Sequence, residues 1–366
     1  MSDPHPLIGR SVTELDTPAL LIDLPVFEAN VSHLASTCQQ LGIDWRPHAK
    51  GHKSPAVAQR LLAAGAIGLT CAKLSEAEIF VDAGVDQILV ANQLASPLKA
   101  HRLARLQARA HVIGIVDCIE AVDLLQQAAE TEQVEIPLLI DVDTGMHRTG
   151  VTPGPSIVAL ADQITERPSL SLEGIMGFEG HTYQDAPDEK AQRCQMAIAH
   201  LETARQDLVD AGHAVQIVSA GGTGCYEQSA HLPGVTELQA GGGIFMDAMY
   251  REACQVTDDL QFALTLLTTV TGVHENHIVT DAGFKTLWSF HHPPRLLTDG
   301  VSFQYLSAEH GVYRKTPGET APSFGDRLTL LPGYHDATTY LHDEFICLRD
   351  GVVEDVWPLA TRGALT

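Results

Sequence analysis

Short apolar runs alternate with longer amphipathic stretches through the middle of the chain. The amphipathic stretches have helical spacing and often end in Gly, as helices commonly do; they include residues 54–65, 73–84, 121–133 and 190–212. The apolar runs are rich in Val, Ile and Leu and lie at residues 44–49, 67–72, 87–92, 111–116, 137–142, 173–178, 215–220 and 236–241. Most of these runs are apolar nearly throughout, which is typical of parallel strands buried on both faces. Eight strands alternating with helices predict an α/β fold of the (β/α)8 TIM barrel type.

A doubly wound sheet is the weaker alternative, because no GxGxxG motif opens a first helix. From about residue 255 the pattern changes: apolar and polar positions alternate, turn signals separate the runs, and helical periodicity is weak. We therefore place residues 17–250 in the barrel and residues 251–366 in a β-rich domain, to which residues 1–16 are a candidate addition. The apolar segment 17–24 predicts one more strand, and it could join either unit.

Charge and cysteine content narrow the classes of function. The chain has 366 residues and a formal net charge of -23, which repels phosphate backbones and anionic lipid, so neither nucleic acid nor membrane is a predicted partner. The seven cysteines are odd in number and form no CxxC pair, which favours a reducing compartment over disulfides. The first residues contain no apolar signal segment, and no apolar run reaches about 18 residues. These features predict a cytoplasmic protein.

Polar residues follow the predicted strands at the ends where a barrel enzyme carries its active site. Lys50 follows the first strand and Asn92 ends the third. The segment "DTGMHRTG" (143–150) follows the fifth strand, and "EGHTY" (179–183) follows the sixth. Catalytic side chains are therefore expected in these loops.

Glycine clusters follow the last two predicted strands, as "GGTG" (221–224) and "GGG" (241–243). Loops after the seventh and eighth strands of barrels frequently bind phosphate, and glycine lets backbone N–H groups approach an anion closely. Ser219 or Thr223 can add a hydroxyl. A phosphate site together with Lys50 at the first strand suggests pyridoxal 5'-phosphate, because its aldehyde needs a lysine for a Schiff base and its phosphate needs an anchor.

The segment "RPHAKGHKSPAVA" resembles the "RPHxKTHK" signature of D-threonine aldolases, 3-hydroxy-D-aspartate aldolases and D-serine dehydratases. These are alanine-racemase-like, fold-type III pyridoxal phosphate enzymes. The resemblance covers nearly the whole chain, with counterparts in order for "TPALLIDL", "AKLSEAE", "DVDTGMHRTGV", "SAGGTG", "ELQAGG", "DAGFK", "EHG" and "VWPLATRG".

The resemblance implies a barrel followed by a β domain, usually as a homodimer. It assigns the Schiff base to Lys50 rather than Lys53. It places Arg148 near the phenolic oxygen of the cofactor, where a permanently charged guanidinium is chemically sensible. It also implies that the ring and phosphate are held by Tyr183, Ser219, Gly221, Gly222, Thr223, Gly241 and Gly242.

A divalent metal (Mn, Mg or Zn) is also implied by the resemblance, in the β domain. Its ligands lie in a stretch written PGHCDPT in aldolases, with His and Asp two residues apart, and with Cys as the second ligand in dehydratases. Here the stretch is "PGYHDAT" (332–338), so Tyr334 takes the histidine position and His335 and Asp336 follow. In a strand, His335 would face away from Asp336 unless a bulge rotates it.

Three outcomes are open for this stretch: His335 and Asp336 as ligands, Tyr334 in place of the histidine, or no metal. An ordinary surface position for His335 is a further alternative. Asp336 favours an aldolase, because no thiolate is offered.

These features together predict a pyridoxal phosphate-dependent lyase that acts on D-β-hydroxy-α-amino acids. Retro-aldol cleavage would release glycine and an aldehyde, with either metal-bound hydroxide or His181 removing the β-hydroxyl proton. His181 in a purely structural hydrogen bond is the alternative for that residue. The rival activities are dehydration of D-serine or D-threo-3-hydroxyaspartate, and metal-free racemisation. A non-catalytic carrier of the cofactor is disfavoured by the additional β domain.

Overall fold

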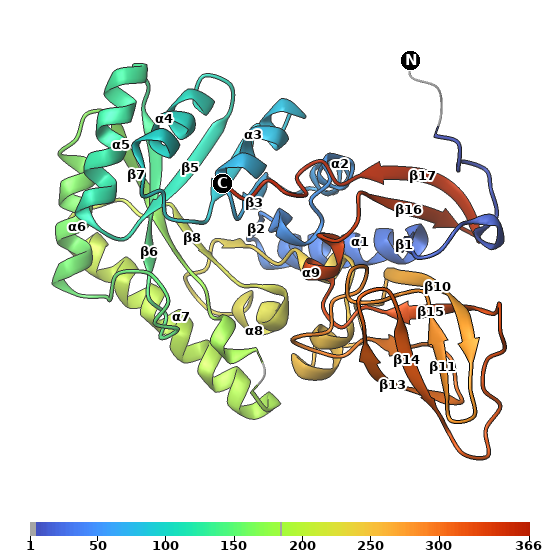
Figure 1. Cartoon of the computed structure of the whole chain (residues 1–366). Coiled ribbons are helices and arrows are strands. Elements are labelled where there is room, and N and C mark those ends of the chain that lie inside the picture. Colours follow the sequence, from blue (N-terminus) through green and yellow to red (C-terminus); the bar gives the residue numbers. More distant parts are fainter. Residues whose placement is uncertain (1–4, 184) are drawn as a thin grey trace. The chain divides into compact units, whose positions relative to one another are not determined.

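The computed structural model of the protein describes residues 5–183 and 185–366, which form two compact units (Figure 1). We call them the barrel unit and the β unit. Of the described residues, the barrel unit comprises those within 34–50, 58–241 and 363–366, and the β unit comprises 5–33, 51–57 and 242–362.

The barrel unit contains eight parallel strands within the described chain, in the spatial order β2-β9-β8-β7-β6-β5-β4-β3. A parallel bridge between His48 and Thr70 links the two ends of this order. The fold class predicted from the apolar runs is thereby confirmed. The strands are β2 (Asp44–Trp45), β3 (Leu69–Cys71), β4 (Gln87–Val90), β5 (His111–Val116), β6 (Ile136–Val142), β7 (Leu170–Gly177), β8 (Ile217–Ala220) and β9 (Glu237–Leu238).

Helices alternate with these strands and cover them on the outside (Figure 1). They begin where side chains can satisfy free backbone N–H groups: Ser96 Oγ accepts the N–H of Lys99 at the start of α4, and buried Glu76 accepts two N–H groups ahead of α3. The helices are α3 (Leu74–Asp82), α4 (Pro97–Leu106), α5 (Ile119–Glu132), α6 (Pro155–Thr165), α7 (Pro187–Asp210) and α8 (Tyr226–Ser229). Two further helices, α1 (Leu24–Leu41) and α2 (Pro55–Ala63), have residues in both units.

Apolar side chains of neighbouring strands fill the barrel, in a cluster formed by Leu89, Ile113, Ile115, Leu139 and Met176. One ion pair is also buried in this unit. The Arg46 Nε atom lies 3.0 Å from both carboxylate oxygens of Glu237, and the two side chains are only 3% and 2% exposed. Because β2 and β9 are neighbours in the sheet, this pair holds the first strand of the barrel to the last.

The β unit is built on a mainly antiparallel sheet with the order β13-β14-β11-β10-β1-β16-β17, with β15 beside β10 and β12 beside β15. Its strands are β1 (Ala19–Asp23), β10 (Leu264–Val273), β11 (His277–Thr280), β12 (Arg295–Leu296), β13 (Val301–Leu306), β14 (Gly311–Lys315), β15 (Arg327–Leu331), β16 (Glu344–Arg349) and β17 (Val352–Pro358). A short helix, α9 (His335–Thr339), lies between β15 and β16.

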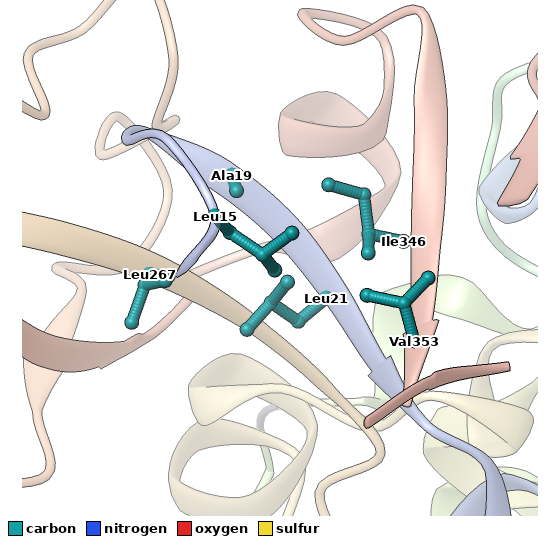
Figure 2. Packing of buried hydrophobic residues seen from close by; sticks show 6 residues of the cluster. All are labelled: Leu15, Ala19, Leu21, Leu267, Ile346 and Val353. Atoms are coloured by element: carbon teal, nitrogen blue, oxygen red, sulfur yellow. The ribbon is translucent and has the colours of Figure 1, made fainter. Parts of the chain in front are cut away.

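Strand β1 comes from the start of the chain and lies inside this sheet, antiparallel to β10 and parallel to β16. Leu15, Leu21, Leu267, Ile346 and Val353 converge on it in one apolar cluster (Figure 2). The predicted segment 17–24 is therefore a strand, and it belongs to the β unit because its apolar face packs there. This differs from the predicted boundary, which assigned residues 17–33 to the barrel.

Within residues 5–183 and 185–366, no helix combines the length and the apolar character that crossing a membrane requires.

The buried Arg46–Glu237 pair yields a prediction of stability. Arg46→Met should leave the Glu237 carboxylate buried without a counter-charge and lower the free energy of unfolding by about 3–5 kcal/mol. Arg102→Met breaks the more exposed pair between Arg102 and Glu78, and it should cost no more than about 1 kcal/mol. Urea denaturation of both variants measures the difference. Equal losses would contradict the importance assigned to the buried pair.

Candidate functional site

A cavity of about 330 Å³ lies in the barrel unit, and both Lys50 and Arg148 are on its wall. The sequence placed these two residues at different strand ends, and the fold brings them together. The other lining residues are His48, Ala72, Ala91, Asn92, Gln93, Ile115, Asp141, Thr149, Met176, Phe178 and Gln239. The volume is within the range of small-ligand sites, and the wall combines apolar surface with a few convergent polar groups, as such sites usually do.

Lys50 is positioned by the turn that follows β2. It lies in a single 3-10 turn, Ala49–Gly51, and its backbone N–H donates to His48 Nδ1 at 3.3 Å. The backbone N–H of His48 in turn donates to the carbonyl of Gln239, 3.0 Å away, just after β9. Lys50 is therefore attached to the end of the barrel through its own backbone N–H and through His48, and it lines the cavity.

Arg148 lies on a loop that leaves β6 and returns to it. Asp143 Oδ1 accepts the N–H groups of Gly145 and His147 at 3.0 and 2.9 Å, and a parallel bridge between Val142 and Val151 closes the loop. The Arg148 guanidinium lies over the Phe178 ring, 5.1 Å from its centre. This distance is typical of a cation–π contact. The charge is thus held on the cavity wall by an aromatic face.

A buried carboxylate organises the glycine loop after β8. Glu179 is fully buried, and it accepts the Gly221 N–H at 3.4 Å, the Cys225 thiol at 2.7 Å and the Ser229 hydroxyl at 2.6 Å. Burial, together with the neighbouring Cys194 thiol and Glu179, raises the pKa of Cys225 well above its usual value, so this thiol remains a donor. The predicted phosphate loop is therefore fixed to the end of β7.

Tyr183 packs directly on this loop. A Cβ atom on Gly222 would lie 1.6 Å from the Tyr183 hydroxyl oxygen, so residue 222 has no space for a side chain. The Tyr183 ring also meets Phe178 edge-on, with ring centres 5.6 Å apart. Because Phe178 lies under Arg148, one aromatic pair connects the glycine loop to the cavity.

The remaining residues predicted to hold a cofactor lie in both units. Ser219 is buried, and its hydroxyl accepts a hydrogen bond from the cavity-lining Gln239 at 2.9 Å. Thr223 is 2% exposed, in the turn next to Gly222. Gly241 lies against the backbone of His48 in the barrel unit. Gly242 belongs to the β unit, where Tyr250 and His335 are its neighbours.

His181 is not among the residues that line the cavity. It lies in the 3-10 turn Gly180–Thr182 after β7, and its Nδ1 atom is buried without a hydrogen-bond partner among the described residues. Burial and the nearby charge of Arg193 lower its pKa, which keeps the imidazole neutral at physiological pH. His181 therefore has the charge state that a base needs. It is not on the cavity wall that carries Lys50.

Sequence reasoning missed several polar residues of the cavity, namely His48, Gln93, Asp141 and Gln239. Gln93 Nε2 donates to Asp141 Oδ2 at 2.8 Å, and Asp141 is only 5% exposed. A signal was present in the chain: each of these residues stands within or directly after one of the eight predicted strands. A polar residue at such a position faces the barrel interior, where burial must be compensated by hydrogen bonds.

The β unit contains the stretch predicted to bind a metal. His335 is fully buried, its Nδ1 lies 2.7 Å from Asp247 Oδ2, and its Nε2 lies 3.0 Å from Asp336 Oδ1. Burial alone would lower the pKa of His335, but the neighbouring carboxylates of Asp336 and Asp247 raise it to about 9. Tyr334 donates from its hydroxyl to Asp336 Oδ2 at 2.7 Å, and burial raises its pKa, so this phenol keeps its proton.

The structure answers two points about this stretch that the sequence left open. It is not a strand: Tyr334 precedes the short helix α9, and the helical turn places consecutive residues His335 and Asp336 beside each other without a bulge. His335 is also not a surface residue. Its neighbour Gly51 explains how it fits, because a Cβ atom there would lie 2.8 Å from His335 Nε2 and 2.6 Å from Asp336 Oδ1. The resembled signature has Thr at this position, and a threonine side chain would collide with the pair.

The His335–Asp336 pair has some of the properties of a metal site. His335 Nε2 is buried and makes no hydrogen bond within the described chain, while its other ring nitrogen rests on a carboxylate, as in most metal-binding histidines. Among residues 5–183 and 185–366, however, no group of three or more His, Cys, Asp or Glu side chains has metal-ligand geometry. The described residues at this place therefore offer His335 and Asp336 as the two candidate ligands.

Two family models match the chain. The model of the alanine racemase N-terminal domain matches residues 22–249, and that of a putative serine dehydratase domain matches residues 263–348. The boundary between the matches falls close to the point where the sequence pattern changes.

Similar proteins cover nearly the whole chain. D-threonine aldolase of Arthrobacter sp. is 35% identical over 97% of this chain and 95% of its own length. The 3-hydroxy-D-aspartate aldolase of Paracoccus denitrificans (strain Pd 1222) is 34% identical over 98% of this chain and 95% of its own length. Among solved structures, D-threonine aldolase from Filomicrobium marinum superimposes with a TM-score of 0.93 at 32% identity, covering 98% of this chain and 99% of that one.

Gly222 offers a test of the loop geometry. Gly222→Ala should displace Tyr183 and the loop, because the backbone at 222 tolerates alanine (φ -89°) and only the space is lacking. We expect a loss of about 1–3 kcal/mol in stability, together with weaker retention of added pyridoxal phosphate. Adding Tyr183→Phe removes the colliding oxygen and should restore part of both. Thermal unfolding and visible absorbance report the two effects.

The control is Gly272→Ala in the β unit, where the nearest atom to the new Cβ would be 3.3 Å away and should move easily. Equal effects at positions 222 and 272 would contradict this account of Tyr183.

Proposed function

This chain belongs to the alanine-racemase-like family that includes the D-threonine and 3-hydroxy-D-aspartate aldolases, and we propose that it is a pyridoxal phosphate-dependent lyase of D-β-hydroxy-α-amino acids. Its reaction would be carbon–carbon cleavage that yields glycine and an aldehyde. The observation that carries the proposal is the cavity that joins Lys50 and Arg148 in a chain similar to these aldolases over nearly its full length.

The cavity fits pyridoxal phosphate in its chemistry. Bound there, the cofactor would supply an electron sink for the electrons released when the Cα–Cβ bond breaks. Lys50 would attach it through its amine, and Arg148 would hold the phenolic oxygen with a charge that does not titrate. With Gly221 bound to Glu179, the loop would hold the phosphate through Gly222 and Thr223, with the Ser219 hydroxyl nearby.

The role of the β unit rests on His335 and Asp336. We infer that this pair holds a divalent metal such as Mn, Mg or Zn, an ion that supplies Lewis-acid chemistry. Asp247 would fix the orientation of the His335 ring through Nδ1, so that Nε2 remains the coordinating atom. Tyr334 would hold one oxygen of Asp336 and direct the other toward His335.

His181 is a candidate for the base that takes the β-hydroxyl proton. Its support is the neutral, partly buried imidazole, since a base must be unprotonated at the working pH. His181 is not among the residues of the cavity wall, so the geometry of the cavity does not support this role.

Dehydration is the second candidate function. The match of residues 263–348 to a putative serine dehydratase domain favours it. Asp336 favours the aldolase, because the resembled dehydratases carry Cys at that position. The homodimer and the cytoplasmic location expected from the sequence remain proposals. A size-exclusion measurement tests the first and fractionation of the source cells the second.

The activity is tested by supplying D-threonine and D-threo-3-hydroxyaspartate to the purified protein with pyridoxal phosphate and Mn²⁺. We expect aldehyde and glycine without ammonia, since a lyase of this kind breaks the carbon–carbon bond. Lys50→Ala should lose both turnover and the visible absorbance of bound cofactor, whereas Lys53→Ala should keep the absorbance. Ammonia and a keto acid would indicate the dehydratase instead, and absence of all these products would refute the lyase.

Metal binding is tested without relying on activity. The protein is dialysed against Mn²⁺ and its metal content measured by atomic spectroscopy. His335→Gln should abolish stoichiometric retention, and Asp247→Asn should weaken it by about 10–100-fold, because the ring loses its orienting carboxylate. His292→Gln, at a histidine of the β unit paired with Glu252, serves as the control and should retain the metal. Equal metal content in all four proteins would remove His335 from the site.

A further inference from the structure

Asp141 is a buried carboxylate for which the proposed reaction has no role. It is the sixth residue of β6, it is 5% exposed, and among the described residues of the cavity wall it is the one carboxylate. Lys50 and Arg148 are on the same wall. An apolar residue would cost less at this position, because a buried charge loses several kcal/mol of hydration. A carboxylate here therefore requires interactions that compensate for its burial, and one of them is the hydrogen bond from Gln93.

The side chain and backbone of Asp141 both hold the segment that carries Arg148. Its backbone carbonyl accepts the Val151 N–H at 2.8 Å, on the far side of the loop. Burial raises the pKa of Asp141, while hydrogen bonds from Thr149 and Gln93 and the charge of Arg148 act in the opposite direction. Thr149 directly follows Arg148 in the chain. Asp141, Arg148 and Thr149 also line the same cavity, so the carboxylate shares a wall with the arginine and with the residue that follows it.

Arg148 needs such a constraint. Its side chain is exposed and lies on a loop, and a long exposed side chain has many rotamers available. The Phe178 ring supports one face of the guanidinium, but a ring face restricts direction weakly. Asp141 is a carboxylate on the same cavity wall, and a negative charge there would attract the guanidinium toward the cavity.

We propose that Asp141 is the positioning residue of Arg148: it anchors the loop through Thr149 and holds the guanidinium toward the cavity by its negative charge. The inference rests on the proposed function, in which Arg148 binds the phenolic oxygen of the cofactor. Asp141 also adds a negative charge to a wall that otherwise carries the amine of Lys50 and the guanidinium of Arg148. The acidic group beside it is Asp117, which shares the Gln93 amide as a donor.

Asp117 provides a matched control. Gln93 Nε2 donates to Asp117 at 3.2 Å and to Asp141 at 2.8 Å, and Asp117 also accepts the Gly150 N–H at 3.1 Å. Asp117 is therefore attached to the same loop, but it is not a residue of the cavity wall. A purely structural role would be disturbed by either Asp→Asn substitution. A role that depends on a negative charge at the cavity wall would be disturbed only by the substitution at Asp141.

The first experiment is a pH titration of the visible absorbance of bound pyridoxal phosphate. Asp141→Asn should move the midpoint downward by about one pH unit, because loss of a nearby negative charge makes protonation of the chromophore less favourable. Asp117→Asn should leave the midpoint close to that of the unchanged protein. Equal shifts in the two variants, or none at Asp141, would overturn the inference. This readout requires cofactor binding but no cleavage, so it is independent of whether the protein proves to be a lyase.

The second experiment is a double-mutant cycle on the cleavage of D-threonine. Asp141→Asn and Arg148→Lys should each reduce kcat by about 10–100-fold, the cost of a misplaced catalytic group, and the double variant should lose little more than either alone. Additive losses would show that Asp141 does not act through Arg148. Should Asp141→Asn fail to fold, Asp141→Glu takes its place: it keeps the charge but moves it, so the absorbance midpoint should stay and kcat should fall. An unchanged kcat in that variant would equally overturn the inference.

Discussion

The fully buried carboxylate of Glu179 is the constraint on which the candidate cofactor site depends. A polar group buried away from water is stable only when hydrogen-bond partners surround it, and here a backbone N–H, a thiol and a hydroxyl from the segment after β8 converge on Glu179. The glycine loop is thus fixed to the end of β7. Phe178 directly precedes Glu179, and it supports Arg148 on one side and Tyr183 on the other. The residues that follow β7 therefore order both the glycine loop after β8 and the part of the cavity wall that carries Arg148.

Much of this arrangement could be predicted from the sequence. Runs that are apolar on both faces and alternate with helices leave few folds other than a barrel, and a barrel places the residues after each strand at one end. Lys50 and the segment 143–150 were found in this way, because each follows a strand, whereas Arg148 was singled out within that segment by the family resemblance. Asp141 and Gln239 were not found, because they stand inside or directly after apolar runs, where hydrophobic patterning does not distinguish a wall residue from a core residue.

The β unit was harder to predict for two physical reasons. Strand β1 is identical in pattern to a barrel strand, and only its pairing with β10 and β16 decides where it belongs. The stretch around His335 was interpreted with the two-residue period of a strand, whereas a helical turn brings consecutive residues together. The space for His335 is provided by Gly51, far away in the sequence, and no local pattern contains that information.

The position of β1 has a consequence for the order in which the protein forms during synthesis. Its residues Ala19–Ile22 pair with Leu264–Leu267, so about 240 residues must be added before the antiparallel partner exists. At roughly 5–20 residues per second, that delay is on the order of 10–50 s. Every strand of the barrel is made within this interval, so the barrel can fold first. During that time the apolar strand β1 has an unpaired edge, and the ribosome-bound chain must be protected from pairing with other chains there.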